Sequence, residues 1–263
     1  MDRARLVTNS ADIFQQEWSD ITLRPFVSLA KSARPWFEVQ CESGRDVIQE
    51  IPGLLQHLDD HLPVTYAGET GIAINLGTRA LLDASFLENF LAQIRARQIT
   101  PSRLRLMIND RRIPDSGEVI SELANCGLQL MADRFIADHR LFDVLANPHV
   151  NVIRLDVHMA RDILRSALAR RLVKGLKALA DELNKQLIAA GIESFSQALA
   201  FESLGCDTFQ GPYYGDGMTV DQALVFAREA RQIVTPVAFR PTSDYRSAVN
   251  AFNRSASAIG RAK

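Results

Sequence analysis

The sequence predicts an α/β protein, a modified TIM-type (β/α)8 barrel whose first strand runs antiparallel to its neighbour. Three observations support this fold class. Eight short apolar or β-rich segments occur within about 200 residues. Most of them are separated by stretches with helical periodicity, which is typical of a parallel sheet. No glycine-rich phosphate loop follows the first strand, so a closed barrel is favoured over an open doubly wound sheet.

The predicted strands are, in chain order, residues 21–27, 36–40, 71–76, 104–109, 128–134, 150–156, 186–192 and 208–214. Helical periodicity is found at residues 85–98, 116–127, 160–185 and 194–205, and the last two stretches end near Asn or Gly, as helices commonly do. The link between the first two strands is too short for a crossover helix. These two strands should therefore pair antiparallel.

The barrel should extend over residues 21–235, between a helical lead-in (1–20) and a C-terminal tail (236–263). Apolar residues of the tail, from Tyr245 to Ile259, are spaced by about one helical turn, so the tail is a candidate amphipathic helix. Residues 240–263 carry five Lys or Arg against one Asp, a net charge of +4. Such a helix would either pack on the barrel or bind a partner.

The composition excludes several classes of protein. The 263 residues are 47% hydrophobic and 23% charged with a net charge of −1, which gives no overall field for nucleic acid or an anionic membrane. The three cysteines are widely spaced and form no CxxC motif, as expected for buried thiols in a reducing compartment. Neither a signal peptide nor an apolar run of membrane-spanning length is found. A cytoplasmic protein is predicted, with nucleic acid an unlikely partner and no membrane association.

Polar side chains recur where the predicted strands end. In (β/α)8 barrels the C-terminal ends of the strands meet on one rim, where binding and catalytic residues collect. One polar residue at a strand end is ordinary, because strand ends and turns are polar in most proteins. Several on one rim instead predict a functional site. They are Glu38, Asn75, Asp133, Arg154, Asp156, Glu193 and Gln210.

Short motifs at these strand ends resemble those of the EAL-type cyclic-di-GMP phosphodiesterases of bacteria. GLQLMADRF (127–135) resembles the family's strand ending in DDFG, AAGIES (189–194) its AEGVET, and LGCDTFQG (204–211) its LGxDxxQG. The segments that stand for its EAL, its INLS, its strand ending in EITE and its KID are EVQ (38–40), INLG (74–77), LRLMIND (104–110) and RLD (154–156). The resemblance is strongest in the second half of the chain.

The resemblance implies hydrolysis of one phosphodiester of cyclic-di-GMP by a pair of divalent ions held by carboxylates. Glu38, Asn75 and Asp133 match metal ligands of the family. Met107 stands where a ligand glutamate is expected, and a thioether is a poor ligand for Mg²⁺ or Mn²⁺. One ligand position is therefore lost.

Arg134 and Ala190 replace two further groups of the family's site. Arg134 stands for the second Asp of DDFG, and a guanidinium ~4 Å from a divalent ion would repel it by roughly 8 kcal/mol at an effective dielectric near 20. Ala190 stands where the general-base glutamate is expected, and a methyl group cannot take a proton from water. The sequence therefore predicts a vestigial site without metal, cofactor or hydrolysis.

Two interpretations of Arg134 are open. In the first, it is a structural counterion for the carboxylates left at the rim. In the second, intact cyclic-di-GMP is held without metal by the forked guanidinium groups of several arginines. The nucleotide-binding residues would then be Arg24, Arg134, Arg154, Asp156, Glu193 and Gln210.

The predicted function is that of a catalytically inactive EAL-like regulatory protein of bacterial cyclic-di-GMP-type signalling, which binds an unidentified regulatory protein. Three departures from the family favour this prediction. Glu42 replaces an arginine expected near the substrate phosphate, residues 136–141 lack the family's loop glycines, and the first half is about one helix shorter. The alternatives are a metal-independent cyclic-di-GMP receptor and a residual phosphodiesterase. A homodimer is compatible with each of these.

Overall fold

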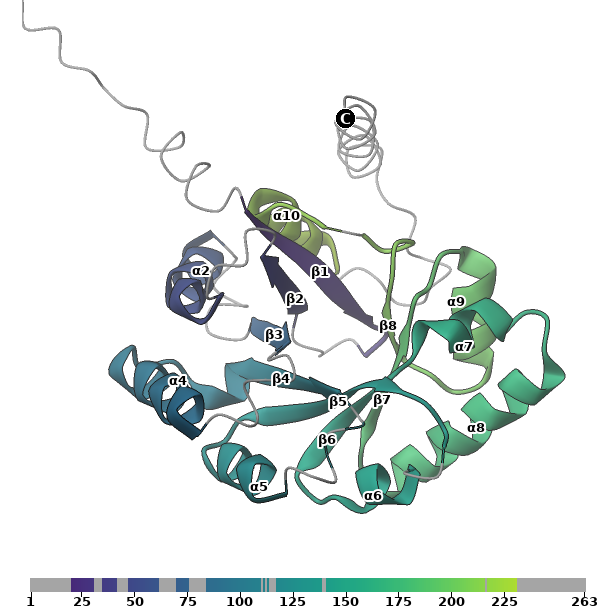
Figure 1. The fold of residues 1–263 in the computed structure, drawn as a ribbon. Helices are drawn as coiled ribbons and strands as arrows, with labels where there is room; N and C mark the ends of the chain where they lie inside the picture. The colour runs from purple at the N-terminus through teal and green to yellow at the C-terminus, as the bar shows by residue number, and fades with distance from the viewer. Residues whose placement is uncertain are drawn as a thin grey trace, which may run out of the picture.

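A closed eight-stranded barrel forms the centre of the molecule, with helices around its outside (Figure 1). The computed structural model describes residues 20–30, 35–41, 47–61, 70–75, 84–109, 111, 113, 117–138, 141–215 and 217–230. The predicted fold class is confirmed. The predicted lead-in and tail fall in residues 1–19 and 231–263, outside the described residues, and stay predictions.

The strands follow one another around the barrel in chain order, and β8 closes it by pairing with β1. The first strand is antiparallel to both of its neighbours, whereas all the other pairs are parallel. The short link after β1 explains this arrangement, because a parallel pair needs a long crossover. The bounds are β1 Ile21–Ser28, β2 Trp36–Cys41, β3 Gly71–Asn75, β4 Leu104–Asn109, β5 Gln129–Phe135, β6 Val150–Leu155, β7 Gln186–Ala190 and β8 Thr208–Gln210.

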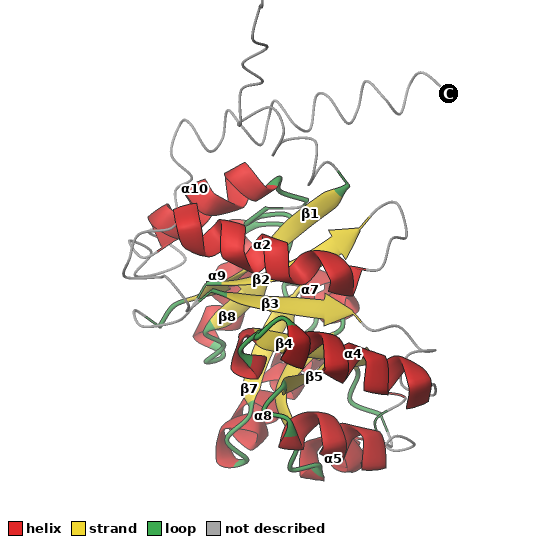
Figure 2. Cartoon of the chain, turned by 90° about the vertical axis from the view of Figure 1, so that its left-hand side faces the viewer, coloured by secondary structure: helices red, strands yellow, loops and turns green. Residues whose placement is uncertain are grey.

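Helices connect the parallel strands and cover the barrel from outside (Figure 2). The last helix, α10, packs against β1 and α2 and so covers the part of the barrel that has no crossover helix. Within the described residues, no helix combines the length and the apolarity needed to span a bilayer. The bounds are α2 Val47–His61, α4 Ala84–Ala96, α5 Gly117–Asn125, α6 Leu141–Ala146, α7 Val157–Asp162, α8 Ala167–Glu182, α9 Phe195–Ser203 and α10 Val220–Ala230, with a 3-10 helix at Pro101–Arg103.

Two predicted elements differ from the structure in extent. The helix predicted over residues 160–185 is split into α7 and α8, because the side chain of Ser166 accepts a hydrogen bond from the backbone N–H of Ala169 and begins a new helix there. Strand β8 ends at Gln210 rather than at residue 214. The chain turns at Gly211, whose φ is +155°, and the N–H of Tyr213 then donates to the carbonyl of Ile192.

Apolar side chains fill both sides of the strands. The inner cluster takes one residue from each of the strands β1 to β7, and the outer core lies between the strands and the helices. The inner cluster consists of Phe26, Trp36, Ala73, Met107, Met131, Val152 and Ile188. The middle of the barrel interior is therefore filled by apolar side chains.

Two glycines should respond in opposite ways to substitution by alanine. A Cβ at Gly211 would overlap the backbone of Ile192, which cannot move without disturbing the barrel rim, so Gly211→Ala should lower the free energy of unfolding by about 2 kcal/mol. A Cβ at Gly175, within α8, would meet nothing within 4 Å, so Gly175→Ala should raise it by about 0.5–1 kcal/mol. Urea unfolding of both variants measures these changes. A neutral Gly211→Ala would contradict the close packing at this turn.

Candidate functional site

A cavity of about 460 Å³ opens at the C-terminal rim of the barrel. It is where the ends of the parallel strands meet, which explains why residues far apart in sequence converge there. Of the sequence-predicted site residues, all except Met107 line it. They are Arg24, Glu38, Asn75, Asp133, Arg134, Arg154, Asp156, Ala190, Glu193 and Gln210.

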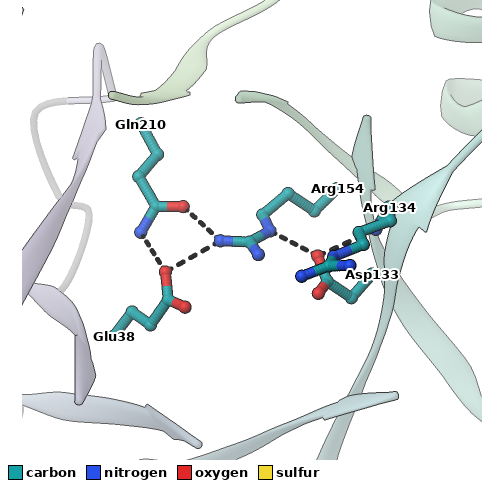
Figure 3. Close-up of polar contacts among 5 residues, drawn as sticks. All are labelled: Glu38, Asp133, Arg134, Arg154 and Gln210. Atoms are coloured by element: carbon teal, nitrogen blue, oxygen red, sulfur yellow. Dashed lines mark hydrogen bonds and ion pairs between the residues drawn. The ribbon is translucent and has the colours of Figure 1, made fainter. Parts of the chain in front are cut away.

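Arg154, on β6, bridges the rim (Figure 3). Its Nε donates to Asp133 Oδ1 at 2.6 Å, and its Nη1 donates to Glu38 Oε2 at 2.8 Å. The same Nη1 donates to Gln210 Oε1 at 2.5 Å, while Gln210 Nε2 donates to Glu38 Oε2 at 2.9 Å. These contacts join strands β2, β5, β6 and β8 through one guanidinium.

The network is nearly closed to solvent. The side chains of Glu38, Asp133 and Arg154 are 6%, 4% and 14% exposed. Burial opposes the charge of Arg154, but the charges of Glu38 and Asp133 and their hydrogen bonds outweigh it and raise the pKa of Arg154 above its usual value. Arg154 is therefore a permanent cation held between two carboxylates.

Arg134 lines the cavity, and its charge contributes to lowering the pKa of Asp156. Its φ is +55°, a left-handed conformation, and it lies at an irregularity in the pairing of β5 with β6. Its backbone N–H donates to Asp133 Oδ1 at 2.8 Å, and its exposed side chain makes no ion pair with any described residue. The cation that pairs with the buried Glu38 and Asp133 carboxylates among the described residues is Arg154.

The side chain of Asp156 caps the N-terminus of α7. Its side chain accepts hydrogen bonds from the backbone N–H of His158, at 2.9 Å, and from the His158 ring. Burial acts against ionisation, but these hydrogen bonds and the nearby charges of His158 and Arg134 hold the pKa of Asp156 below its usual value. Asp156 is thus an ionised helix cap.

Three polar or charged residues that line the cavity were not among the site residues predicted from sequence. They are Gln40, His158 and Arg161. Gln40 lies two residues after Glu38 on the same face of β2, and strand periodicity could have indicated it. His158 and Arg161 reach the rim from α7, which the sequence had merged with the helix that follows. Glu42 and residues 139–140 lie outside the described residues.

The residues present are poorly suited to hold a pair of divalent ions. Arg154 already takes one oxygen of Glu38 and one of Asp133, and Met107 is 1% exposed within the apolar inner cluster. Ala190 lines the cavity with a methyl group. Among the described residues, no group of three or more His, Cys, Asp or Glu side chains is placed to hold a metal ion. A hard cation that binds Glu38 and Asp133 would have to share these two carboxylates with a guanidinium.

The carboxylates and guanidinium groups of the described residues that line the cavity are equal in number. Its carboxylates belong to Glu38, Asp133, Asp156 and Glu193, and its guanidinium groups to Arg24, Arg134, Arg154 and Arg161. The cavity therefore exerts no large net field on an anion or a cation that approaches it.

These features place the chain in a known class of barrel proteins. The family model of the EAL domain matches residues 49–216, and the chain belongs to the EAL domain family. The resemblance seen in the short motifs is thereby confirmed.

Several curated relatives carry cyclic-di-GMP chemistry in their names. A cyclic di-GMP phosphodiesterase of Pseudomonas aeruginosa is 25% identical over 155 residues, which cover 57% of this chain and 26% of the relative. The cyclic di-GMP phosphodiesterase PdeR of Escherichia coli is 24% identical over 144 residues, which cover 53% of this chain and 22% of the relative. The matched region thus spans about a quarter of the length of these relatives.

Solved structures share the fold. The EAL enzyme Bd1971 in its cGMP-bound form superposes with a TM-score of 0.71 at 16% identity, covering 87% of this chain and 71% of that one. The EAL domain of Mycobacterium smegmatis DcpA gives a TM-score of 0.67 at 17% identity, covering 80% of this chain and 96% of that one. The FimX EAL domain from Pseudomonas aeruginosa, bound to c-di-GMP, gives 0.62 at 20% identity, with coverage of 80% and 96%.

Removal of the Arg154 guanidinium should strand two buried carboxylates. We expect Arg154→Met to lower the free energy of unfolding by about 3–5 kcal/mol. Adding Glu38→Gln and Asp133→Asn to that variant should recover most of the loss, because no buried charge is then left unpaired. Arg161→Met, which removes an exposed cation of the same cavity, serves as control and should stay within about 0.5 kcal/mol of the wild type. Equal losses in the single and triple variants, measured by urea unfolding, would contradict the bridging role.

Proposed function

We propose that this EAL-domain protein is a catalytically inactive regulator in bacterial cyclic-di-GMP signalling and acts by binding another protein. The observation that carries the proposal is the position of Arg154, whose guanidinium occupies the space between Glu38 and Asp133. In this arrangement the rim carboxylates serve the fold, and they are not free to serve a reaction.

Loss of phosphodiesterase activity is supported by three positions together. Phosphodiester hydrolysis by carboxylate-held ions requires hard oxygen ligands and a base for the attacking water. Met107 supplies a buried thioether, Ala190 a methyl group, and Arg134 a cation at the cavity wall. No described group at these positions can replace the missing functions.

A metal-independent cyclic-di-GMP receptor is the second candidate. It is favoured by Arg24, Arg134 and Arg161, which line the rim cavity and could bind phosphate oxygens. The balanced charge of the cavity argues against it, because a dianionic dinucleotide would gain little from the net field. It would also compete with the carboxylates for Arg154. We therefore place this candidate second and a residual phosphodiesterase third.

A protein-binding role is supported by apolar side chains that remain exposed on two helices. On α8, Leu168 and Leu172 lie one turn apart and are 66% and 43% exposed. On α9, Phe195 and Leu199 have the same spacing and are 39% and 43% exposed. Apolar pairs on a helix surface are typical of sites that bind a helix or a groove of a partner.

Hydrolysis gives the first test of this proposal. Purified protein with Mg²⁺ or Mn²⁺ should not convert cyclic-di-GMP to the linear dinucleotide, measured by chromatography with PdeR as the active control. Single reversions at Met107, Arg134 or Ala190 to the family's Glu, Asp or Glu should not restore activity, because ligands and base act as a unit. Metal-dependent turnover near one per second, a low rate for an ordinary enzyme, would contradict the proposal.

Calorimetry of cyclic-di-GMP binding in EDTA distinguishes the protein-binding regulator from the metal-independent cyclic-di-GMP receptor. We expect cyclic-di-GMP to bind more weakly than micromolar, because binding must break the ion pairs of Arg154. Arg134→Ala and Arg161→Ala provide matched variants that remove cavity cations without touching the buried network. If cyclic-di-GMP binds without metal at micromolar affinity or tighter, and either substitution abolishes this binding, that result would contradict the protein-binding proposal and favour the receptor.

A further inference from the structure

A second charged side chain is buried at the opposite end of the barrel. Arg105 is the second residue of β4 and is 4% exposed. Its guanidinium carbon lies 4.1 Å from the centroid of the Trp36 ring, at the start of β2. Its Nε and Nη2 donate to Gln129 Oε1 at 3.2 and 2.9 Å, and Nη2 also donates to Gln186 Oε1 at 3.3 Å. Because Gln129 and Gln186 begin their strands, this group lies at the N-terminal end.

Arg105 has no counterion among the described residues. Arg103, two residues earlier, donates through both of its terminal nitrogens to the carboxylate of Asp59 at 2.7 and 2.8 Å. Arg154 at the other end of the barrel is paired with two carboxylates. The described partners of Arg105 are amide oxygens and aromatic rings, and burial lowers its pKa to about 10. It therefore stays charged at neutral pH, and no carboxylate of the described residues neutralises this charge.

Arg105 lines a cavity of about 610 Å³ whose walls suit an anion. The other polar side chains of the lining are hydrogen-bonding groups, and the described lining contains no Asp or Glu. They belong to Ser102, Gln129, His149, Asn151, Asn184 and Gln186. The rim cavity, in contrast, has as many carboxylates as arginines.

A second buried cation, with no carboxylate partner among the described residues, is adjacent in the chain to residues that line this cavity. Lys185 is 8% exposed and stands in the chain between two lining residues, Asn184 and Gln186. Its Nζ donates to the backbone carbonyls of Asn147 and Val150 at 2.7 and 2.5 Å. Burial lowers its pKa, because carbonyl groups do not replace a full negative charge. The N-terminal end of the barrel thus combines two buried cations with a cavity free of acidic side chains in its described lining.

We propose that this cavity is a binding site for a small oxyanion, the carboxylate or phosphate group of a ligand, held by Arg105. Nη1 of Arg105 makes no hydrogen bond to a described residue and is the donor left for such a group. Trp36 and the two glutamines fix the plane of the guanidinium, so the site is ordered before an anion enters. The inference is independent of the function proposed for the rim, because it uses none of the rim residues.

The melting temperature of the full chain, measured in phosphate or acetate and in chloride at equal ionic strength, tests the site. An anion that binds the folded protein at ten times its Kd should raise the melting temperature by roughly 3–6 °C. A shift with phosphate alone assigns a phosphoryl ligand, and a shift with both anions extends the class to carboxylates. No shift beyond that in chloride with either anion would mean that Arg105 only closes the end of the barrel, and would overturn the proposal.

Variants separate this site from the general effect of salts and from the rim. Gln129→Glu places a carboxylate on the atoms that already contact Arg105, so it should raise the melting temperature in chloride and remove the anion-specific shift. Arg105→Met should also remove the shift, and Gln129→Glu suffices if Arg105→Met does not fold. Arg161→Met, at the rim, should keep the shift. A shift that persists in Gln129→Glu, or disappears in Arg161→Met, would refute the assignment to Arg105.

Discussion

The contact of the Arg154 guanidinium with Glu38 and Asp133 is the constraint on which the rim of this barrel depends. Each partner is nearly buried, and each would be costly to leave unpaired. The contact also ties β6 to β2 and β5 and, through Gln210, to β8, so it links strands on different sides of the barrel. The same atoms therefore determine the stability of the rim and the chemistry that remains available to it.

This constraint also explains how the cavity above the network differs from a metal centre. In a site built around divalent ions, neighbouring carboxylates are neutralised by a ligand that can leave. Here the neutralising charge is covalently attached to β6 and does not leave. Arg134 adds a further cation to the cavity lining from an irregularity in the pairing of β5, where its φ is left-handed. The described carboxylates and arginines of the rim are consequently equal in number.

Much of the fold could be predicted from the sequence, because strand-like segments alternate with helical periodicity and the first link is short. Convergence of the rim residues could also be predicted, since parallel strands end on one side of a barrel.

The pairing of Arg154 with Glu38 and Asp133 could not be predicted from sequence. It depends on how far the Arg154 side chain extends from β6 to partners on other strands of the barrel. The stacking of Arg105 on Trp36 could not be predicted from sequence either, because it joins β4 to β2, two strands that are not neighbours in the barrel. The end of α7 was missed because Ser166, a local capping residue, lies within a continuous helical pattern.

The two ends of the barrel differ in how the charge of a buried arginine is compensated. The charge of Arg154 is compensated by two carboxylates of the same chain. Within the described part of the chain, the charge of Arg105 is compensated by amide dipoles and aromatic faces, which attract a cation without cancelling its charge. The free energy of that end therefore depends on whether an anion is present. Because the buried Arg154 is paired within the chain, we expect sensitivity to a small anion at the opposite end, where Arg105 has no carboxylate partner among the described residues.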